Sequence, residues 1–91
     1  MDSQKKLKKQ TLPKWFKGMI YKEGAEVTNP FSGESYELTG VELSLYDFII
    51  GCQMVFDTVP NTMTTKRINE FQKALNWIRN NNPEAYYVLL D

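Results

Sequence analysis

The sequence predicts a small α+β protein, in which an N-terminal antiparallel β-meander packs against two main helices and a short C-terminal element. Residues from about 18 to 38 group β-branched and aromatic residues in short runs separated by Gly, Asn and Pro, which is typical of strands joined by turns. Residues from about 45 to 57 and from about 65 to 80 instead repeat apolar residues at helical spacing. The 91 residues suit one compact domain with a small core.

The first 12 residues, MDSQKKLKKQTL, are polar and rich in lysine. Leu7 and Leu12 are too few large apolar side chains to support a packed element before Pro13. The sequence therefore predicts a flexible tail at residues 1–12 and a single α+β domain at residues 13–91.

The register of the meander can be predicted from a four-residue turn at Pro30–Gly33. This turn places Val27 opposite Tyr36 and Ala25 opposite Leu38, so that their side chains share one face. Pro30 presets the φ angle of the second position of such a turn, and Gly33 accepts the left-handed conformation that often closes it.

A turn at Glu23–Gly24 would add a further strand before this hairpin. Ile20 then falls opposite Val27, and an apolar stripe of Ile20, Val27 and Tyr36 crosses three strands. Two or three short strands are marginally stable alone, so the sheet needs a cover, which we expect the helices to supply.

The first helix is expected to use Ser44 as its N-cap, with Asp47 at the third helical position and Leu43 packing on Phe48. Its buried stripe is predicted to consist of Leu45, Phe48, Ile49, Cys52, Val55 and Phe56.

A second apolar side of this helix carries Ile50 and Met54, with Gly51 between them. Such a side must be covered by another element or by another chain, and glycine permits close approach. We therefore predict a homodimer that forms through Ile50, Gly51 and Met54. The alternative is that residues 86–90 fold back over Ile50 and Met54 and complete the monomer.

The second helix is expected to use Thr64 as its N-cap. Its buried residues should be Ile68, Phe71, Leu75 and Ile78, with Ala74 beside them, and its outward residues should be Lys66, Arg67, Glu70, Lys73 and Asn76. Asn82 and Pro83 are predicted to start a short third helix. A strand over residues 85–90 is the alternative, because YYVLL is rich in strand-forming residues.

Composition argues against several classes of function. The sequence holds no histidine and one cysteine, which removes Ser–His and Cys–His nucleophile pairs, histidine zinc sites and intrachain thiolate clusters. Cys52 lies on an apolar stripe and is predicted to be a buried structural thiol. Ser32 and Ser35 fit the turn without a catalytic role, because the G-x-S-x-G pattern is absent. We expect no catalytic residues, no cofactor and no metal site.

The location is predicted to be cytoplasmic, without a membrane partner. No stretch of the sequence reaches the roughly 18–20 consecutive apolar residues that a membrane span needs. The lysine-rich start is also not followed by the apolar region of a signal peptide.

The net charge of zero conceals a strong segregation of charge. Residues 1–22 hold seven lysines and one acid, whereas residues 23–57 hold seven acids and no base. Glu26 and Glu37 face one another in the predicted register, which favours a basic partner or the protein's own lysine tail nearby.

The stretch KKLKKQTLPKWFK combines lysines with adjacent aromatics, the two ingredients of single-strand nucleic-acid binding. The residues that would make these contacts are Lys5, Lys6, Lys8, Lys9, Lys14 and Lys17, together with Trp15 and Phe16. A solubilising tail, with Trp15 and Phe16 closing the edge of the core, explains the same composition and is preferred. The sequence thus favours a non-enzymatic accessory or protein-interaction module with an unknown protein partner, and nucleic-acid binding is the alternative.

Four segments together resemble small uncharacterised proteins of marine T4-like phages, especially cyanophages. These segments are LPKWFKGMIY, NPFSGE, VELSLYDFIIGCQMVFD and NNPEAYYVLLD, and the resemblance covers about residues 12–91. It implies a phage or environmental source and an accessory role in an infected bacterial cytoplasm. It supplies no catalytic residues.

Overall fold

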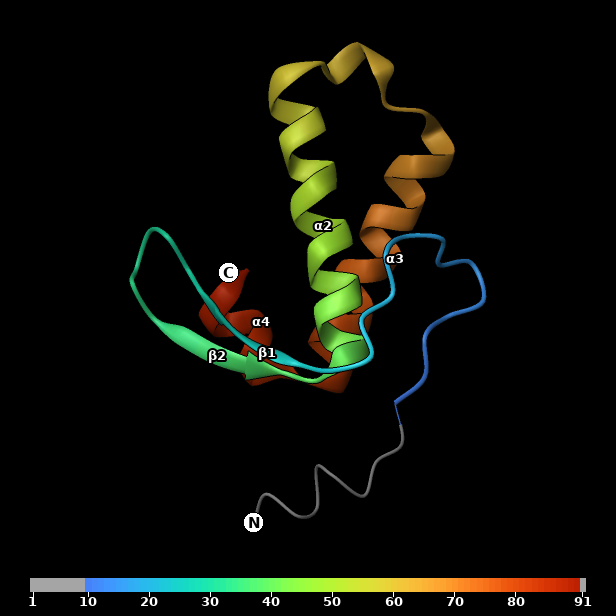
Figure 1. The fold of residues 1–91 in the computed structure, drawn as a ribbon. Coiled ribbons are helices and arrows are strands. Elements are labelled where there is room, and N and C mark those ends of the chain that lie inside the picture. Colours follow the sequence, from blue (N-terminus) through green and yellow to red (C-terminus); the bar gives the residue numbers. More distant parts are fainter. Residues whose placement is uncertain (1–9, 91) are drawn as a thin grey trace.

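The computed structural model describes residues 10–90, and residues 1–9 and 91 lie outside the described part. A two-stranded antiparallel sheet is followed by α-helices and a short 3-10 helix (Figure 1). The elements are β1 (Ala25–Thr28), β2 (Ser35–Leu38), α2 (Gly40–Thr58), η1 (Pro60–Thr62), α3 (Thr65–Asn81) and α4 (Pro83–Leu89). The α+β class predicted from the sequence is confirmed.

The β1–β2 hairpin has the predicted register. Val27 pairs with Tyr36 and Ala25 pairs with Leu38. Gly33 closes the turn with a φ of 80°, in the left-handed region that favours glycine. The Asn29 side chain accepts a hydrogen bond from the Phe31 backbone N–H at 2.8 Å, which fixes the turn locally.

The further strand expected around Ile20 is not formed, since the sheet of the described residues contains β1 and β2 alone. Ile20 is 64% exposed. The backbone N–H of Tyr21 instead donates a hydrogen bond to Ser44 Oγ at 2.9 Å. The segment around Tyr21 therefore lies against the first turns of α2. The Ser44 hydroxyl of that helix accepts the hydrogen bond that a neighbouring strand would otherwise have accepted.

The start of α2 also differs from the prediction. Thr39, not Ser44, is the N-cap: its hydroxyl accepts from the Glu42 N–H at 3.2 Å, and the Glu42 carboxylate accepts from the Thr39 N–H at 2.9 Å. This reciprocal pair is a capping box. Ser44 lies inside the helix, where its buried hydroxyl donates to the Gly40 carbonyl at 2.8 Å.

Both later helices begin where the sequence predicts. The Thr64 hydroxyl accepts from the Arg67 N–H at 3.1 Å and caps α3. The Asn82 side chain accepts from the Ala85 N–H at 3.2 Å and caps α4, in which Pro83 occupies the first turn. The C-terminal element is therefore a helix, and the alternative strand over residues 85–90 is not formed.

Two apolar clusters form the core of the described residues. The first joins the N-terminal segment to α2 and α3 through Phe16, Leu45, Ile49, Ala74 and Ile78. The second joins β2 to α4 through Leu38, Ala85 and Leu89. The helical stripes are thus largely as predicted, and Trp15 and Phe16 close the edge of the core.

Residues 10–12, which were expected to belong to the tail, make contacts with the domain. Gln10 donates to the Glu42 carboxylate at 2.7 Å and accepts from the Thr39 hydroxyl at 2.7 Å. Leu12 packs against the first core cluster. The predicted tail therefore stays a prediction for residues 1–9, which lie outside the described part.

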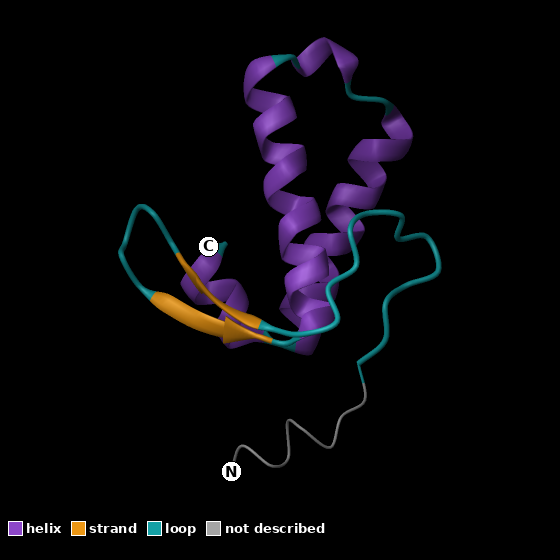
Figure 2. Cartoon of the chain, in the orientation of Figure 1, coloured by secondary structure: helices purple, strands orange, loops and turns teal. Residues whose placement is uncertain are grey.

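The hairpin formed by α2 and α3 extends well beyond the rest of the fold. Figure 2 shows the sheet and α4 beside one end of α2, and η1 joining the helices at the other end. Ile68, predicted to be buried, is exposed because it lies in the first turn of α3, in the part of the hairpin that the sheet and α4 do not reach.

Candidate functional site

The residues predicted to mediate self-association lie together on the second half of α2. Met54 is 63% exposed, Gly51 is exposed and Ile50 is half-buried. Neither Ile50 nor Met54 belongs to a core cluster. A Cβ atom added at Gly51 would meet no other group within 4 Å, so the surface is open at this point.

Residues 86–90, the alternative cover for this surface, do not cover Met54. Helix α4 packs against β2 and α3, and the cluster that contains Leu89 includes Leu43 and Tyr46 from the first turns of α2. Met54 lies further along α2 and stays exposed. The alternative, in which residues 86–90 cover both Ile50 and Met54, is therefore wrong for Met54.

More apolar side chains are exposed near the far end of the same hairpin. Val59 follows α2 directly, and Ile68 lies in the first turn of α3. Both residues are exposed, as is Met54. The end of the hairpin away from the sheet thus carries several exposed apolar side chains.

The predicted nucleic-acid contacts are only partly described. Lys5, Lys6, Lys8 and Lys9 lie outside the described residues. Lys14 and Lys17 are exposed on the N-terminal segment. Phe16 is 9% exposed, and the ring centroids of Trp15 and Phe48 are 5.9 Å apart. Trp15 and Phe16 therefore pack as part of the core, and the face of the Phe16 ring is not available to stack on a base.

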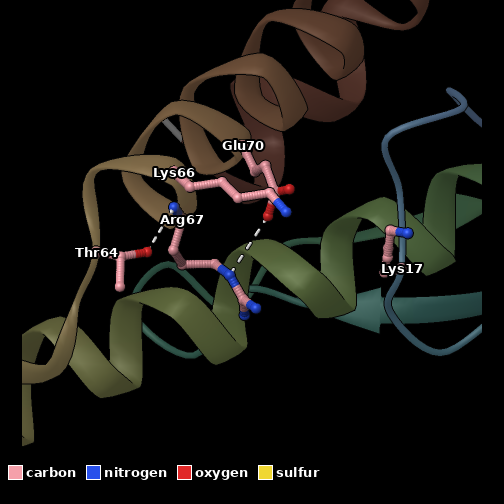
Figure 3. Close-up of a pocket in the computed structure, with 5 residues that line it drawn as sticks. All are labelled: Lys17, Thr64, Lys66, Arg67 and Glu70. Carbon is pink, nitrogen blue, oxygen red and sulfur yellow. Dashed lines mark hydrogen bonds and ion pairs between the residues drawn. The ribbon is translucent and has the colours of Figure 1, made fainter.

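Lys17 lies beside two cations that sequence reasoning did not associate with it. A hollow of about 90 Å³ is lined by Lys17, Thr64, Lys66, Arg67 and Glu70. Figure 3 shows Lys17 on the N-terminal segment, across from the N-cap Thr64 and from Lys66, Arg67 and Glu70 in the first turns of α3. We call this hollow the basic pocket. Lys66 and Arg67 were predicted to face outward, but no local pattern indicates their proximity to Lys17.

Arg67 is held in place by two contacts at the edge of the basic pocket. Its Nε lies 3.4 Å from Glu70 Oε1, and its guanidinium carbon lies 5.6 Å from the centroid of the Phe48 ring. A guanidinium over an aromatic face is attracted by the electron-rich ring. These contacts favour a position of the Arg67 side chain between Glu70 on α3 and Phe48 on α2.

Cys52 is buried, as predicted. Burial raises the pKa of the Cys52 thiol, and the charge of the nearby Arg67 offsets part of that rise. The thiol therefore stays protonated at neutral pH, in agreement with a structural role.

The acidic residues give no metal site in the part of the chain that the structure describes, where no group of three His, Cys, Asp or Glu is placed to hold a metal ion. Glu26 and Glu37 are paired across the two strands, as predicted, and both are exposed. No helix within residues 10–90 has the length and apolar character that crossing a bilayer requires.

Comparisons of the chain with protein-family models, with curated proteins and with solved structures found no match. The resemblance to marine phage proteins therefore stays a prediction. Two features of the described residues remain as candidate sites, the basic pocket and the α2 surface, which is formed by Ile50, Gly51 and Met54.

Proposed function

We propose that this protein is a non-enzymatic interaction module that works as a homodimer. The dimer forms through the second half of α2, where Ile50, Gly51 and Met54 meet the same residues of a second copy. The observation that carries this proposal is the exposure of Met54 beside Ile50 and an open Gly51 on a helix whose opposite side is already buried.

A second copy is the occupant that fits this surface. The chain carries no net charge, so two copies do not repel one another as whole molecules. Gly51 has no side chain and lies in open space, which lets a second helix approach closely. A two-fold axis near Gly51 would pair the exposed Met54 side chains with apolar groups of the partner.

The resemblance to marine phage proteins supports an accessory role in an infected bacterial cytoplasm. In this proposal the dimer presents its remaining surfaces to a protein partner whose identity is unknown. Nucleic-acid binding stays the alternative: the exposed Lys14 and Lys17 favour it, whereas the burial of Phe16 removes one of the two proposed stacking rings.

Light scattering over a dilution series tests the dimer. We expect the dimer mass at high micromolar concentration and a loss of mass on dilution. Met54→Glu should leave the protein folded and monomeric, because it places a charge in the apolar contact. Gln72→Glu is the matched control, since it adds the same charge at an exposed position on α3. A wild-type chain that keeps the monomer mass at every concentration would rule the dimer out.

A further inference from the structure

The basic pocket brings cations together from two distant parts of the chain. Lys17 belongs to the N-terminal segment, and Lys66 and Arg67 belong to the first turn of α3 (Figure 3). No described residue forms an ion pair with Lys17 or Lys66. From this convergence we infer that the basic pocket binds a phosphate group, a function separate from the proposed dimer surface.

The charge of the pocket matches a doubly charged oxyanion. Glu70 is the one carboxylate among the lining residues, and its charge is paired with Arg67. Lys17, Lys66 and Arg67 against Glu70 leave two uncompensated positive charges. A phosphate monoester carries about −1.5 to −2 charges at neutral pH, so it balances the pocket more closely than chloride or a carboxylate does.

The donors of the pocket suit an oxyanion as well. The ion pair with Glu70 uses the Nε of Arg67, and a guanidinium carries further N–H donors on its terminal nitrogens. The contacts with Glu70 and Phe48 restrain this half-exposed group in advance, which lowers the entropic cost of binding. Lys17 and Lys66 add ammonium donors on flexible stems, which can close on the ligand from both sides.

The size of the pocket limits what can enter it. The volume of the hollow is about 90 Å³. Sites for drug-sized molecules span about 300 Å³ or more. The pocket thus takes one compact group, while the rest of any larger ligand stays outside. A free phosphate provides that group with close to two negative charges, whereas a phosphodiester of a nucleic-acid backbone provides similar oxygens with one negative charge.

Titration of the isotope-labelled full chain with sodium phosphate tests this inference. Sodium chloride keeps the ionic strength constant, and the amide signals of Lys17, Lys66 and Arg67 report binding. We expect saturable shifts with phosphate and none that saturate with chloride. Lys66→Ala should weaken phosphate binding by about three- to ten-fold, the range for losing one partly exposed charged contact.

Lys73→Ala is the matched control. It removes an exposed lysine from the same helix, about 10 Å further along the axis at 1.5 Å per residue. Lys73 does not line the pocket, although it lies one turn beyond Glu70, so the control should weaken phosphate binding clearly less than Lys66→Ala does. Equal weakening by Lys66→Ala and Lys73→Ala would overturn the inference, as would a linear, unsaturated response to phosphate.

A second titration with a short single-stranded DNA identifies the source of the phosphate. Shifts at the same amides that Lys66→Ala weakens would indicate a nucleic-acid backbone, and saturation with phosphate alone would indicate a free phosphate. Both results support the pocket, and no saturation with either ligand overturns it. The mass of the protein by light scattering is an independent readout, so the dimer and the pocket can fail separately.

Discussion

Replacing Glu42 with alanine should lower the free energy of unfolding by more than replacing any of the exposed acidic residues. Glu42 is 2% exposed, and its carboxylate accepts hydrogen bonds from three parts of the chain. The donors are the Thr39 N–H at 2.9 Å, the Gln10 side-chain amide at 2.7 Å and the Asn82 side-chain amide at 2.9 Å. One carboxylate thus ties the N-terminal segment and the cap of α4 to the start of α2.

The magnitude follows from these contacts. A hydrogen bond to a charged group contributes about 1.5–3 kcal/mol, and removing one partner leaves the other unsatisfied. The buried Asn82 amide would lose its acceptor in Glu42→Ala, whereas Gln10 could turn toward water. Because the cost of burying the carboxylate disappears as well, the net loss should be about 2–4 kcal/mol. At about 4–8 °C per kcal/mol, the melting temperature should fall by about 8–32 °C.

Chemical denaturation followed by circular dichroism measures this loss. Glu23→Ala is the matched control, because it removes one carboxylate from an exposed turn and should change stability by about 0.5 kcal/mol or less. Glu42→Gln keeps one acceptor oxygen and should fall between the two. A loss below about 1 kcal/mol in Glu42→Ala would refute the view that this carboxylate organises the start of α2.

Three further predictions concern α2. Gly51→Ala should raise the free energy of unfolding of the monomer by up to about 1 kcal/mol, because alanine favours helix and its Cβ meets no other group. The same change should weaken the dimer in light scattering. An unchanged dimer would exclude a close helix contact at Gly51. Added sodium chloride should strengthen the dimer, because Asp47 and Asp57 flank Ile50 and Met54 at helical spacing and would repel the same two residues of the second copy. A dimer that weakens with salt would place the interface elsewhere. The raised pKa of Cys52 should support folding below the ordinary thiol pKa, and this support should be lost as the pH rises through the raised value. The free energy of unfolding of Cys52→Ala should therefore fall less at alkaline pH than that of the wild type. Identical pH profiles for the two proteins would contradict this prediction.

The features that the sequence predicts well are set by local chemistry. The register of the hairpin follows from the turn at Pro30–Gly33, because a four-residue loop fixes which residues face one another. The caps at Thr64 and Asn82 likewise depend on neighbours within one helical turn.

The features that the sequence does not predict depend on contacts between distant segments. Thr39 with Glu42 and Ser44 with Asp47 both fit the spacing of a capping box, and the choice between them depends on the bonds that Glu42 makes with Gln10 and Asn82. The expected strand at Ile20 fails for a related reason, since the neighbouring Tyr21 N–H binds a side chain of α2.

The basic pocket could not be predicted from the sequence either. Its cations come from the N-terminal segment and from α3, which are joined through the apolar cluster that contains Phe16, Ala74 and Ile78. No spacing rule connects Lys17 with Lys66 and Arg67. For the α2 surface, in contrast, the helical period alone separates Ile50 and Met54 from the buried stripe.

A cross-linking measurement tests the proposed dimer most directly. In a Cys52→Ala background, Met54→Cys places a thiol on the proposed contact, and Gln72→Cys places one at an exposed site on α3. On mild oxidation at micromolar concentration, Met54→Cys should form a disulfide-linked dimer rapidly, whereas Gln72→Cys should stay largely monomeric. Equal rates at the two positions, or no cross-link at Met54→Cys, would contradict a homodimer built on this face of α2.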